Sequence, residues 1–175
     1  DYEGDYNIYL NDPRNINLGK KLIMNKKILI EKERLKEINE TEYHEILINH
    51  TTPYSPFDIL ENKSLLLENN FDNLNAIDWD KGCYVGQEIT ARMKYRGLLK
   101  KKLYALKIKS GDVLEGDELI VDNKKIGTIV SKANSNIFAA LNINFVNEIK
   151  NKNQNLVIND SLSFDFLNWK FFSIK

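Results

Sequence analysis

The chain has 175 residues, a net charge of zero and a hydrophobic content of 42%. This composition excludes a wholly disordered chain, and the length suits one large domain or two small ones. No apolar run reaches the roughly 18 to 20 residues that a membrane helix requires, and the sequence starts with acidic residues where a signal peptide is basic. We therefore expect a soluble protein that makes no contact with membranes.

The chain contains one cysteine, Cys83, and two histidines, His44 and His50. A single thiol cannot form an internal disulfide, which fits a reducing compartment. The two histidines are six positions apart and match no common ligand spacing, so we expect no stably bound metal.

The first part of the chain is predicted to alternate short strands with helices. Leu35, Ile38 and Ile46 recur at near-helical spacing with charged residues between them, which favours one long helix. Two prolines fix the loop that follows this helix. The expected elements are strands at residues 6–10 and 22–30, a helix at 33–49, a rigid loop at 51–56, a short extended stretch at 64–67, and an irregular segment or single helical turn at 68–75.

A second helix is predicted over residues 85–96, where apolar residues recur on one face. Gly97 is a natural stop for it, because glycine readily adopts the left-handed conformation that ends many helices. Glu88 precedes Arg92 by four residues, which is the favourable order for an ion pair along a helix.

Beyond Gly97 the pattern changes to short strands separated by turn residues. Asp122-Asn123-Lys124 is a good hairpin turn between two of them. Several short strands at this spacing indicate a small antiparallel barrel. The expected strands are residues 102–108, 118–121, 125–131, 137–143, 155–158, 163–167 and 170–174.

Residues 81–88 read Lys-Gly-Cys-Tyr-Val-Gly-Gln-Glu and contain the only cysteine. A thiolate is favoured near a helix N-terminus and near a cation, and Cys83 lies shortly before the predicted second helix with Lys81 close by. Gly82 and Gly86 permit close approach of the backbone to a ligand. The alternative interpretation is an inert cysteine that packs as a small buried hydrophobe within a glycine turn.

Positive charge is concentrated between residues 81 and 109, which carry nine basic residues and one acidic residue. A basic face of this kind attracts polyanions such as nucleic acid, a polyglutamated cofactor or an acidic partner. The alternative is an ordinary solvated surface rich in lysine. The nine residues are Lys81, Arg92, Lys94, Arg96, Lys100, Lys101, Lys102, Lys107 and Lys109.

The octapeptide, followed by Thr-Ala-Arg at 90–92 and Tyr-Arg-Gly at 95–97, resembles the hallmark of the YgfZ family. These are folate-binding proteins related to the T-protein of glycine cleavage. They are linked to iron–sulfur protein maintenance and, in bacteria, to tRNA modification. The similarity covers most of the chain: further stretches that resemble the family pattern lie at residues 12–19, 43–59, 64–77 and 96–103, and at Gly127 and Ser131.

The resemblance implies an α+β fold in two domains. Residues 1–97 would form part of a ferredoxin-like, folate-binding region, and residues 98–175 a C-terminal antiparallel β-barrel. The N-terminal portion of the family architecture is absent from this sequence, together with the aspartate that is catalytic in the T-protein relatives. Lys21 also stands where the family usually has arginine, which keeps the charge but loses bidentate geometry.

The resemblance places a folate, tetrahydrofolate or a derivative, in the cleft between the two regions. Glu68 matches a glutamate that holds the pterin in the T-protein relatives, and a carboxylate suits that role because it accepts two parallel N–H donors. The alternative for Glu68 is a solvated charge at a strand end. Cys83 is the candidate functional thiol, supported by Lys81. The candidate cofactor-binding residues are Glu68, Lys81, Gly82, Tyr84, Gly86, Gln87, Glu88 and Arg92.

Arg92 and Arg96 have two interpretations. They would bind the carboxylates of a folate glutamyl tail, or they would pair with Glu88 on the same helix. For Arg92 the pairing within the helix is favoured.

Three functions follow from these features. The first is a folate-binding accessory protein for iron–sulfur cluster assembly or repair that uses Cys83 and has no classical turnover of its own. The second is a tetrahydrofolate-dependent aminomethyltransferase of the T-protein type. The third is a nucleic-acid-binding module in which residues 81–109 contact tRNA weakly.

The resemblance also implies where the protein acts and with what. We expect a monomer in the cytoplasm of a bacterium, or in the mitochondrial matrix of a eukaryote. Its partners would be folate and iron–sulfur client or assembly proteins.

Overall fold

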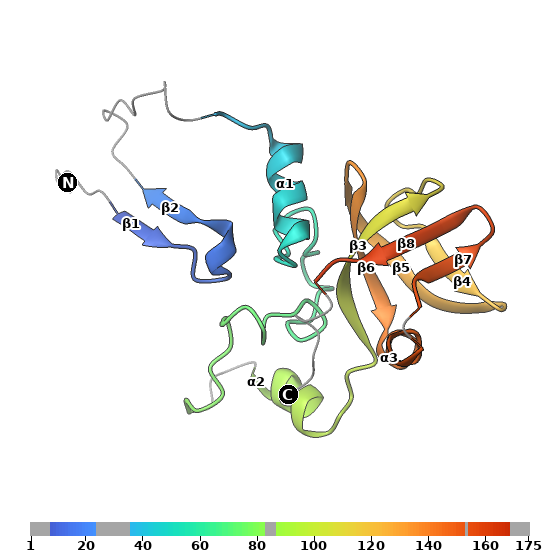
Figure 1. Cartoon of the computed structure of the whole chain (residues 1–175). Coiled ribbons are helices and arrows are strands. Elements are labelled where there is room, and N and C mark those ends of the chain that lie inside the picture. The colour runs from blue at the N-terminus through green and yellow to red at the C-terminus, as the bar shows by residue number, and fades with distance from the viewer. Residues whose placement is uncertain (1–7, 24–35, 83–86, 153, 169–175) are drawn as a thin grey trace.

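The structure is a computed structural model that describes residues 8–23, 36–82, 87–152 and 154–168. Figure 1 shows the whole chain, with a small hairpin at one end and a barrel-like sheet at the other. In chain order the elements are β1 (Ile8–Asn11), a 3-10 helix η1 (Ile16–Leu18), β2 (Lys20–Ile23), α1 (Glu40–Asn49), α2 (Gln87–Tyr95), β3 (Lys101–Ser110), β4 (Glu118–Val121), β5 (Lys124–Ala133), β6 (Asn136–Asn142), α3 (Ile143–Asn151), β7 (Leu156–Asn159) and β8 (Leu162–Phe166).

Strands β3 to β8 form one antiparallel sheet in the order β4-β5-β6-β3-β8-β7. The two outer strands, β4 and β7, also contact each other, so the sheet is nearly closed. The predicted antiparallel barrel is thereby confirmed in its general form. The further strand expected at residues 170–174 lies outside the described residues.

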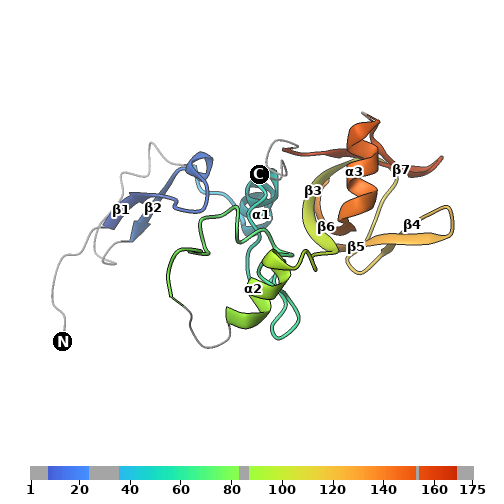
Figure 2. The same cartoon turned by 90° about the horizontal axis from the view of Figure 1, so that it is seen from below.

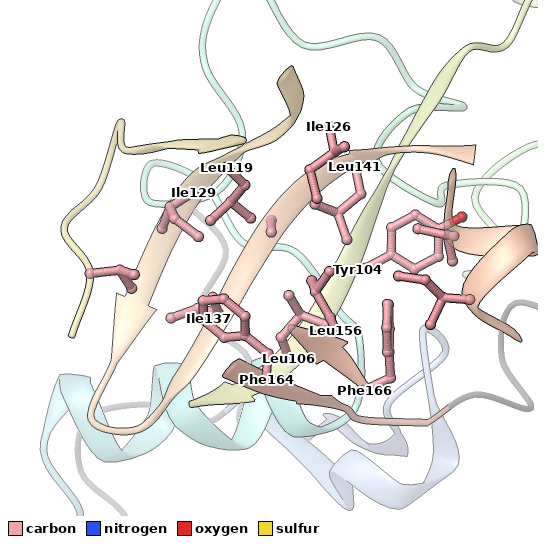
Figure 3. Close-up of a cluster of buried hydrophobic side chains, with 14 residues drawn as sticks. Tyr104, Leu106, Leu119, Ile126, Ile129, Ile137, Leu141, Leu156, Phe164 and Phe166 are labelled. Carbon is pink, nitrogen blue, oxygen red and sulfur yellow. The ribbon is translucent and has the colours of Figure 1, made fainter. Parts of the chain in front are cut away.

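The barrel encloses one hydrophobic core, to which all six strands and α3 contribute (Figure 3). Helix α3 lies at one end of the barrel and adds Val146 and Ile149 to the core. The sequence analysis predicts no helix here; α3 follows β6 directly, because the Asn142 side chain accepts hydrogen bonds from two N–H groups of the first helical turn. The core residues are Tyr104, Leu106, Val113, Leu119, Ile126, Ile129, Ile137, Ala139, Leu141, Val146, Ile149, Leu156, Phe164 and Phe166.

Strand β3 is buried on both faces, because α1 covers the outside of the barrel beside it. Tyr104 and Leu106 point into the barrel core, whereas Leu103 and Ala105 pack outward against Ile48 of α1. This second cluster also includes Ala133 and Phe138. The four consecutive residues 103–106 are therefore all buried, where an ordinary half-exposed strand would alternate.

Helix α1 is shorter than the helix predicted over residues 33–49. It starts at Glu40, and residues 36–39 are not helical. The boundary is set by Asn39, whose side chain accepts from the Glu42 N–H while the Glu42 carboxylate accepts from the Asn39 N–H. This reciprocal pair is a capping box, which satisfies N–H groups that the helix leaves without partners.

The extended stretch predicted at residues 64–67 is also wrong. The Leu66 carbonyl accepts from the N–H groups of Asn69 and Phe71, so the chain closes a series of turns here. The irregular segment predicted for 68–75 is confirmed and continues those turns.

The hairpin turn between β4 and β5 is confirmed. Asp122 and Asn123 form a two-residue connection with φ values of 48° and 60°. Positive φ at both central residues is what a type I′ turn requires, and Asp and Asn tolerate it well.

Strands β1 and β2 form a separate antiparallel hairpin, with Ile8 opposite Ile23 and Asn11 opposite Lys20. Helix α1 lies between this hairpin and the barrel in both views (Figures 1 and 2). The predicted strands at 6–10 and 22–30 are thus present in part, and residues 6, 7 and 24–30 lie outside the described residues. The ferredoxin-like arrangement and the boundary at residue 97 stay predictions.

Candidate functional site

The octapeptide lies between an irregular segment and α2, and only its ends belong to the described residues. Lys81 and Gly82 are exposed, Gln87 is half-buried and Glu88 is exposed. Cys83, Tyr84 and Gly86, which the resemblance implicates, lie outside the described residues. The positions of the thiol and of these two candidates therefore stay predictions.

Helix α2 starts at Gln87, and none of its residues is fully buried. Glu88 and Arg92 form the expected ion pair at 2.5 Å, between two side chains that are both more than half exposed. Such a pair contributes only about 0.3–0.5 kcal/mol. The pairing of Arg92 within the helix is thus present, and its use for a glutamyl carboxylate stays a prediction.

The end of α2 confirms the predicted stop at Gly97. This glycine has a φ of 61°, and the Leu98 N–H donates to the Met93 carbonyl at 3.2 Å. That hydrogen bond and the left-handed glycine together form a Schellman motif. The stop directs the chain from α2 towards the start of β3 at Lys101.

An aromatic and cationic cluster lies between α2 and the segment before the octapeptide. The Lys94 ammonium lies 3.6 Å from the ring centroid of Trp79, and the rings of Trp79 and Tyr95 meet edge-on at 6.3 Å. A cation over an indole face is attracted by the ring quadrupole. These contacts hold the two flanks of the octapeptide together, and the sequence analysis did not single out Trp79.

Glu68 lies against the start of β3. Its backbone carbonyl accepts from the Leu103 N–H at 2.8 Å, and its carboxylate oxygen Oε2 lies 3.3 Å from the Lys101 ammonium. The Glu68 side chain is 18% exposed, whereas that of Lys101 is 54% exposed. Within the described residues no hydrogen bond reaches the second carboxylate oxygen, Oε1.

Asn70 fixes the same loop from inside. Its side-chain amide donates to the Leu103 carbonyl at 2.7 Å, and the residue is fully buried with a φ of 63°. Strand β8 pairs with β3 only from Leu106 onward, so the loop supplies the hydrogen bonds that β8 does not. Glu68 is therefore held by the barrel edge itself and not by a free loop.

Asn70 is a residue that the sequence analysis missed. Its position two residues after Glu68 carries no signal of its own. The Asn70 carbonyl oxygen Oδ1 is buried without a hydrogen-bond partner in the part of the chain that the structure describes.

Several lysines of the basic segment 81–109 are neutralised by carboxylates distant in sequence. Besides Lys101, Lys102 pairs with Asp72 at 3.3 Å and Lys109 with Asp165 at 3.1 Å. Among the described residues, the basic side chains of this segment that take part in no ion pair include Arg96, Lys100 and Lys107. The weak tRNA contact stays a prediction, and these side chains are the ones it would use.

Asp12 and Arg14, which belong to the stretch resembling the family pattern, form a charged cluster in the connection between β1 and β2. The Arg14 guanidinium donates twice to the Asp12 carboxylate, at 3.0 and 2.7 Å, and Lys21 lies 3.6 Å from it. The hydrogen bond from Arg14 lowers the pKa of Asp12 to about 2, although burial opposes the shift. The same interaction raises the pKa of Arg14. The pair is structural, because both charges are satisfied by each other.

Asp58 joins the loop after α1 to the barrel. Its carboxylate accepts hydrogen bonds from the Ser131 hydroxyl of β5 and from the Tyr54 N–H at 2.7 Å, and it lies 2.9 Å from the His44 ring nitrogen Nε2. All three side chains are buried. The serine and the histidine both bind the aspartate and not each other, so this is not the relay of a hydrolase.

Among the residues that the structure describes, no three His, Cys, Asp or Glu side chains lie grouped so as to hold a metal ion. None of the helices that the structure describes has the length and apolar character needed to cross a membrane.

No protein-family model matches the chain. A Dictyostelium discoideum protein named iron-sulfur cluster assembly factor IBA57 homolog, mitochondrial, is 35% identical over 121 residues, which is 65% of this chain and 30% of that protein. The mouse protein named iron-sulfur cluster assembly factor IBA57, mitochondrial, is 30% identical over 101 residues, 57% of this chain and 28% of that protein. Its human counterpart is 30% identical over 102 residues, with the same coverage.

The chain spans less than a third of the length of these relatives. Their names agree with the iron–sulfur function that the resemblance implied, whereas the YgfZ label itself stays a prediction. This chain is therefore similar to part of several mitochondrial iron–sulfur cluster assembly factors.

Proposed function

We propose that this chain is part of an iron–sulfur cluster assembly factor of the mitochondrial matrix, with Cys83 as its functional thiol. The observation that carries the proposal is the 35% identity to the Dictyostelium factor over 121 residues. The names of these three relatives, each of which includes the word mitochondrial, support the choice of compartment. A reducing matrix also suits a chain with a single cysteine.

The thiol has a sequence position that favours its ionised form. Cys83 lies four residues before Gln87, where α2 starts, and a helix N-terminus carries partial positive charge. Exposed Lys81 adds a cation two residues before the thiol. A thiolate is the form that acts as nucleophile or binds the iron of a cluster held by a partner protein.

We further propose that tetrahydrofolate or a derivative binds at Glu68. The support is the arrangement of this carboxylate: it is mostly buried, its backbone is hydrogen-bonded to Leu103, and its Oε1 oxygen accepts from none of the described residues. The end of helix α2 at Tyr95 is six residues from Lys101, so it lies no more than roughly 21 Å from the start of β3. Folate-dependent aminomethyl transfer stays an alternative that no described contact favours.

The role of the thiol is tested in a chimera. The stretch of the Dictyostelium protein that matches this chain is exchanged for the present sequence, and the chimera is expressed in cells that lack their own factor. We expect it to restore the activity of an iron–sulfur enzyme, and Cys83→Ser to reduce that activity at least tenfold. Ile89→Ser, an exposed position on α2, is the matched control and should behave as the parent. Full activity of the Cys83→Ser chimera would refute the role of the thiol.

The folate proposal is tested by titrating the purified chain with tetrahydrofolate. Glu68→Ala should weaken binding at least tenfold, because a charge-assisted hydrogen bond is lost. Asp72→Ala is the matched control, since Asp72 lies in the same loop and also pairs with a lysine of β3. Equal affinities of the parent and Glu68→Ala would show that the pterin binds elsewhere or not at all.

A further inference from the structure

The Glu68–Lys101 pair places a hydrogen-bond donor beside two acceptors at the edge of the barrel. The Lys101 ammonium lies 3.3 Å from Oε2 of Glu68 and has further N–H donors for a third group, and no hydrogen bond from a described residue reaches Oε1. A ligand at this site would meet the two carboxylate oxygens of Glu68 and, beside them, the ammonium nitrogen of Lys101.

We propose that the Lys101 ammonium donates a hydrogen bond to the 4-oxo group of a 2-amino-4-oxopyrimidine ring, and that Glu68 accepts from the N–H groups of the same ring. Such a ring presents, side by side, a carbonyl acceptor, a ring N–H donor and an amino donor. The carboxylate accepts from the two N–H groups, and the ammonium donates to the carbonyl. This inference rests on the proposed folate function and names a specificity residue for that same site.

The neighbouring lysine shows why Lys101 is the residue that can do this. Lys102 is 14% exposed and lies 3.3 and 3.4 Å from the two oxygens of Asp72, so both oxygens of that carboxylate are engaged. Lys101 is 54% exposed, and its ammonium lies 3.3 Å from Oε2 of Glu68. A half-exposed ion pair contributes about 1 kcal/mol or less, so a ligand can rearrange it at small cost.

The backbone around the pair keeps the acceptor side in place. Glu68 and Asn70 are both hydrogen-bonded to Leu103, two residues after Lys101 on the same strand. The backbones of Glu68 and Lys101 are therefore fixed relative to each other through β3, which keeps the carboxylate and the lysine side chain side by side.

Two classes of compound carry this ring edge: the pterin of folates and the guanine base. The proposal concerns the ring edge that pterin and guanine share, and the ligands of the experiment are chosen to tell the two classes of compound apart. Tetrahydrofolate and pterin represent the first class, and guanosine the second. Lumazine keeps the 4-oxo group but has a carbonyl in place of the 2-amino group. It therefore distinguishes the hydrogen bond from Lys101, which it keeps, from the amino hydrogen bond to Glu68, which it lacks.

The experiment measures dissociation constants of these four ligands for the full chain and its variants. Lys101→Met should weaken pterin and lumazine alike, by about tenfold, because both lose the same hydrogen bond to a charged donor. Lys101→Arg, which keeps a donor, should recover most of that loss. Lys100→Met, an exposed lysine one position away that forms no ion pair within the described residues, should change nothing. Glu68→Gln should weaken pterin much more than lumazine.

The outcomes separate this inference from the proposed function. Pterin binding to Lys101→Met that equals or exceeds binding to the parent would overturn the inference, because Lys101 would then only compete for Glu68. A loss confined to pterin would also overturn it, since Lys101 would then act by positioning Glu68. Binding of guanosine but not tetrahydrofolate, lost in Lys101→Met, would support the inference while refuting the folate proposal. No binding of any of the four ligands refutes both.

Discussion

Asp12 is a single residue whose charge stabilises the connection between two strands, so the stability of this connection depends on pH. It lies in the connection between β1 and β2, where its N–H donates to the Gly19 carbonyl at 2.9 Å and its carboxylate accepts from Arg14. Loss of the carboxylate charge removes the ion pair with Arg14. The connection is then held by its backbone hydrogen bonds and by the Asn15 side chain, which donates to the His50 carbonyl at 3.3 Å.

The pKa of Asp12 gives the direction of the pH effect. The hydrogen bond from Arg14 lowers it from 3.8 to about 2 in the folded chain. Since the folded value lies below the unfolded one, the stabilisation is fully present above about pH 4 and is lost as the pH falls through about 2. Hydrogen exchange of the β1 and β2 amides, corrected for intrinsic rates, should therefore lose protection over this range.

Asp12→Asn provides the comparison for that experiment. The variant should exchange faster at pH 5 and show no further loss of protection below pH 4. The amides of β6, which lies in the barrel, serve as the internal reference and should be unaffected. A parent profile that matches the variant's at every pH would contradict the assignment.

At the scale of elements, strand β5 depends on a glycine for its fit against β6. A Cβ at Gly127 would lie 2.5 Å from both the Ala140 carbonyl oxygen and a methyl group of Leu141. Gly127→Ala should therefore destabilise the chain by about 1–3 kcal/mol, because backbone must move to make room. Urea unfolding measures the change. Gly82→Ala, where an added Cβ meets nothing within 4 Å, should leave the midpoint unchanged, and equal midpoints for both variants would contradict the argument.

Elements whose signals are local could be predicted from the sequence. The turn at Asp122 and Asn123 and the helix stop at Gly97 depend on the residues themselves, and both are found where expected. The start of α1 was placed too early because apolar periodicity continues before Asn39, whereas the capping box decides the boundary. Helix α3 was missed because its first residues continue the apolar pattern of β6, and only Asn142 marks the change.

The candidate site was predictable to a lesser extent. The resemblance singled out Glu68 as a ligand-binding residue, but its partner Lys101 is 33 positions away and was named only as one of nine basic residues and as part of the stretch 96–103. Asn70 is buried because the pairing of β8 with β3 starts only at Leu106, which leaves room for the loop beside Leu103. This arrangement is a property of the folded barrel, and no sequence pattern indicates it. Contacts of this kind arise from tertiary structure and cannot be predicted from the spacing of residues along the sequence.

At the scale of the whole molecule, the two predicted domains share buried surface. Leu103, Ala105 and Phe138 on the outside of the barrel are 2% exposed or less, because Ile48 and its neighbours on α1 cover them. The Asp58–Ser131 hydrogen bond adds a buried polar contact across the same boundary. Neither side is therefore expected to reach its full stability alone.

This sharing predicts the behaviour of residues 98–175 as an isolated fragment. The fragment should keep β-sheet structure by circular dichroism but unfold at a lower urea concentration than the full chain, by at least 2 kcal/mol in free energy, because the outer cluster is opened to water. It should also bind a hydrophobic dye that the full chain does not. Equal stability of fragment and full chain would show that α1 contributes nothing to the barrel.

The loop at Glu68 and Asn70 has a consequence beyond ligand binding. It occupies the stretch of the β3 edge that β8 leaves open, by bonding both the N–H and the carbonyl of Leu103. An uncovered strand edge is a template on which a strand of another molecule can pair. Cleavage of the chain just before this loop would free those groups and open the barrel to edge-to-edge association with other copies. The loop that carries Glu68 thus also covers a strand edge that would otherwise be open to pairing with another copy of the chain.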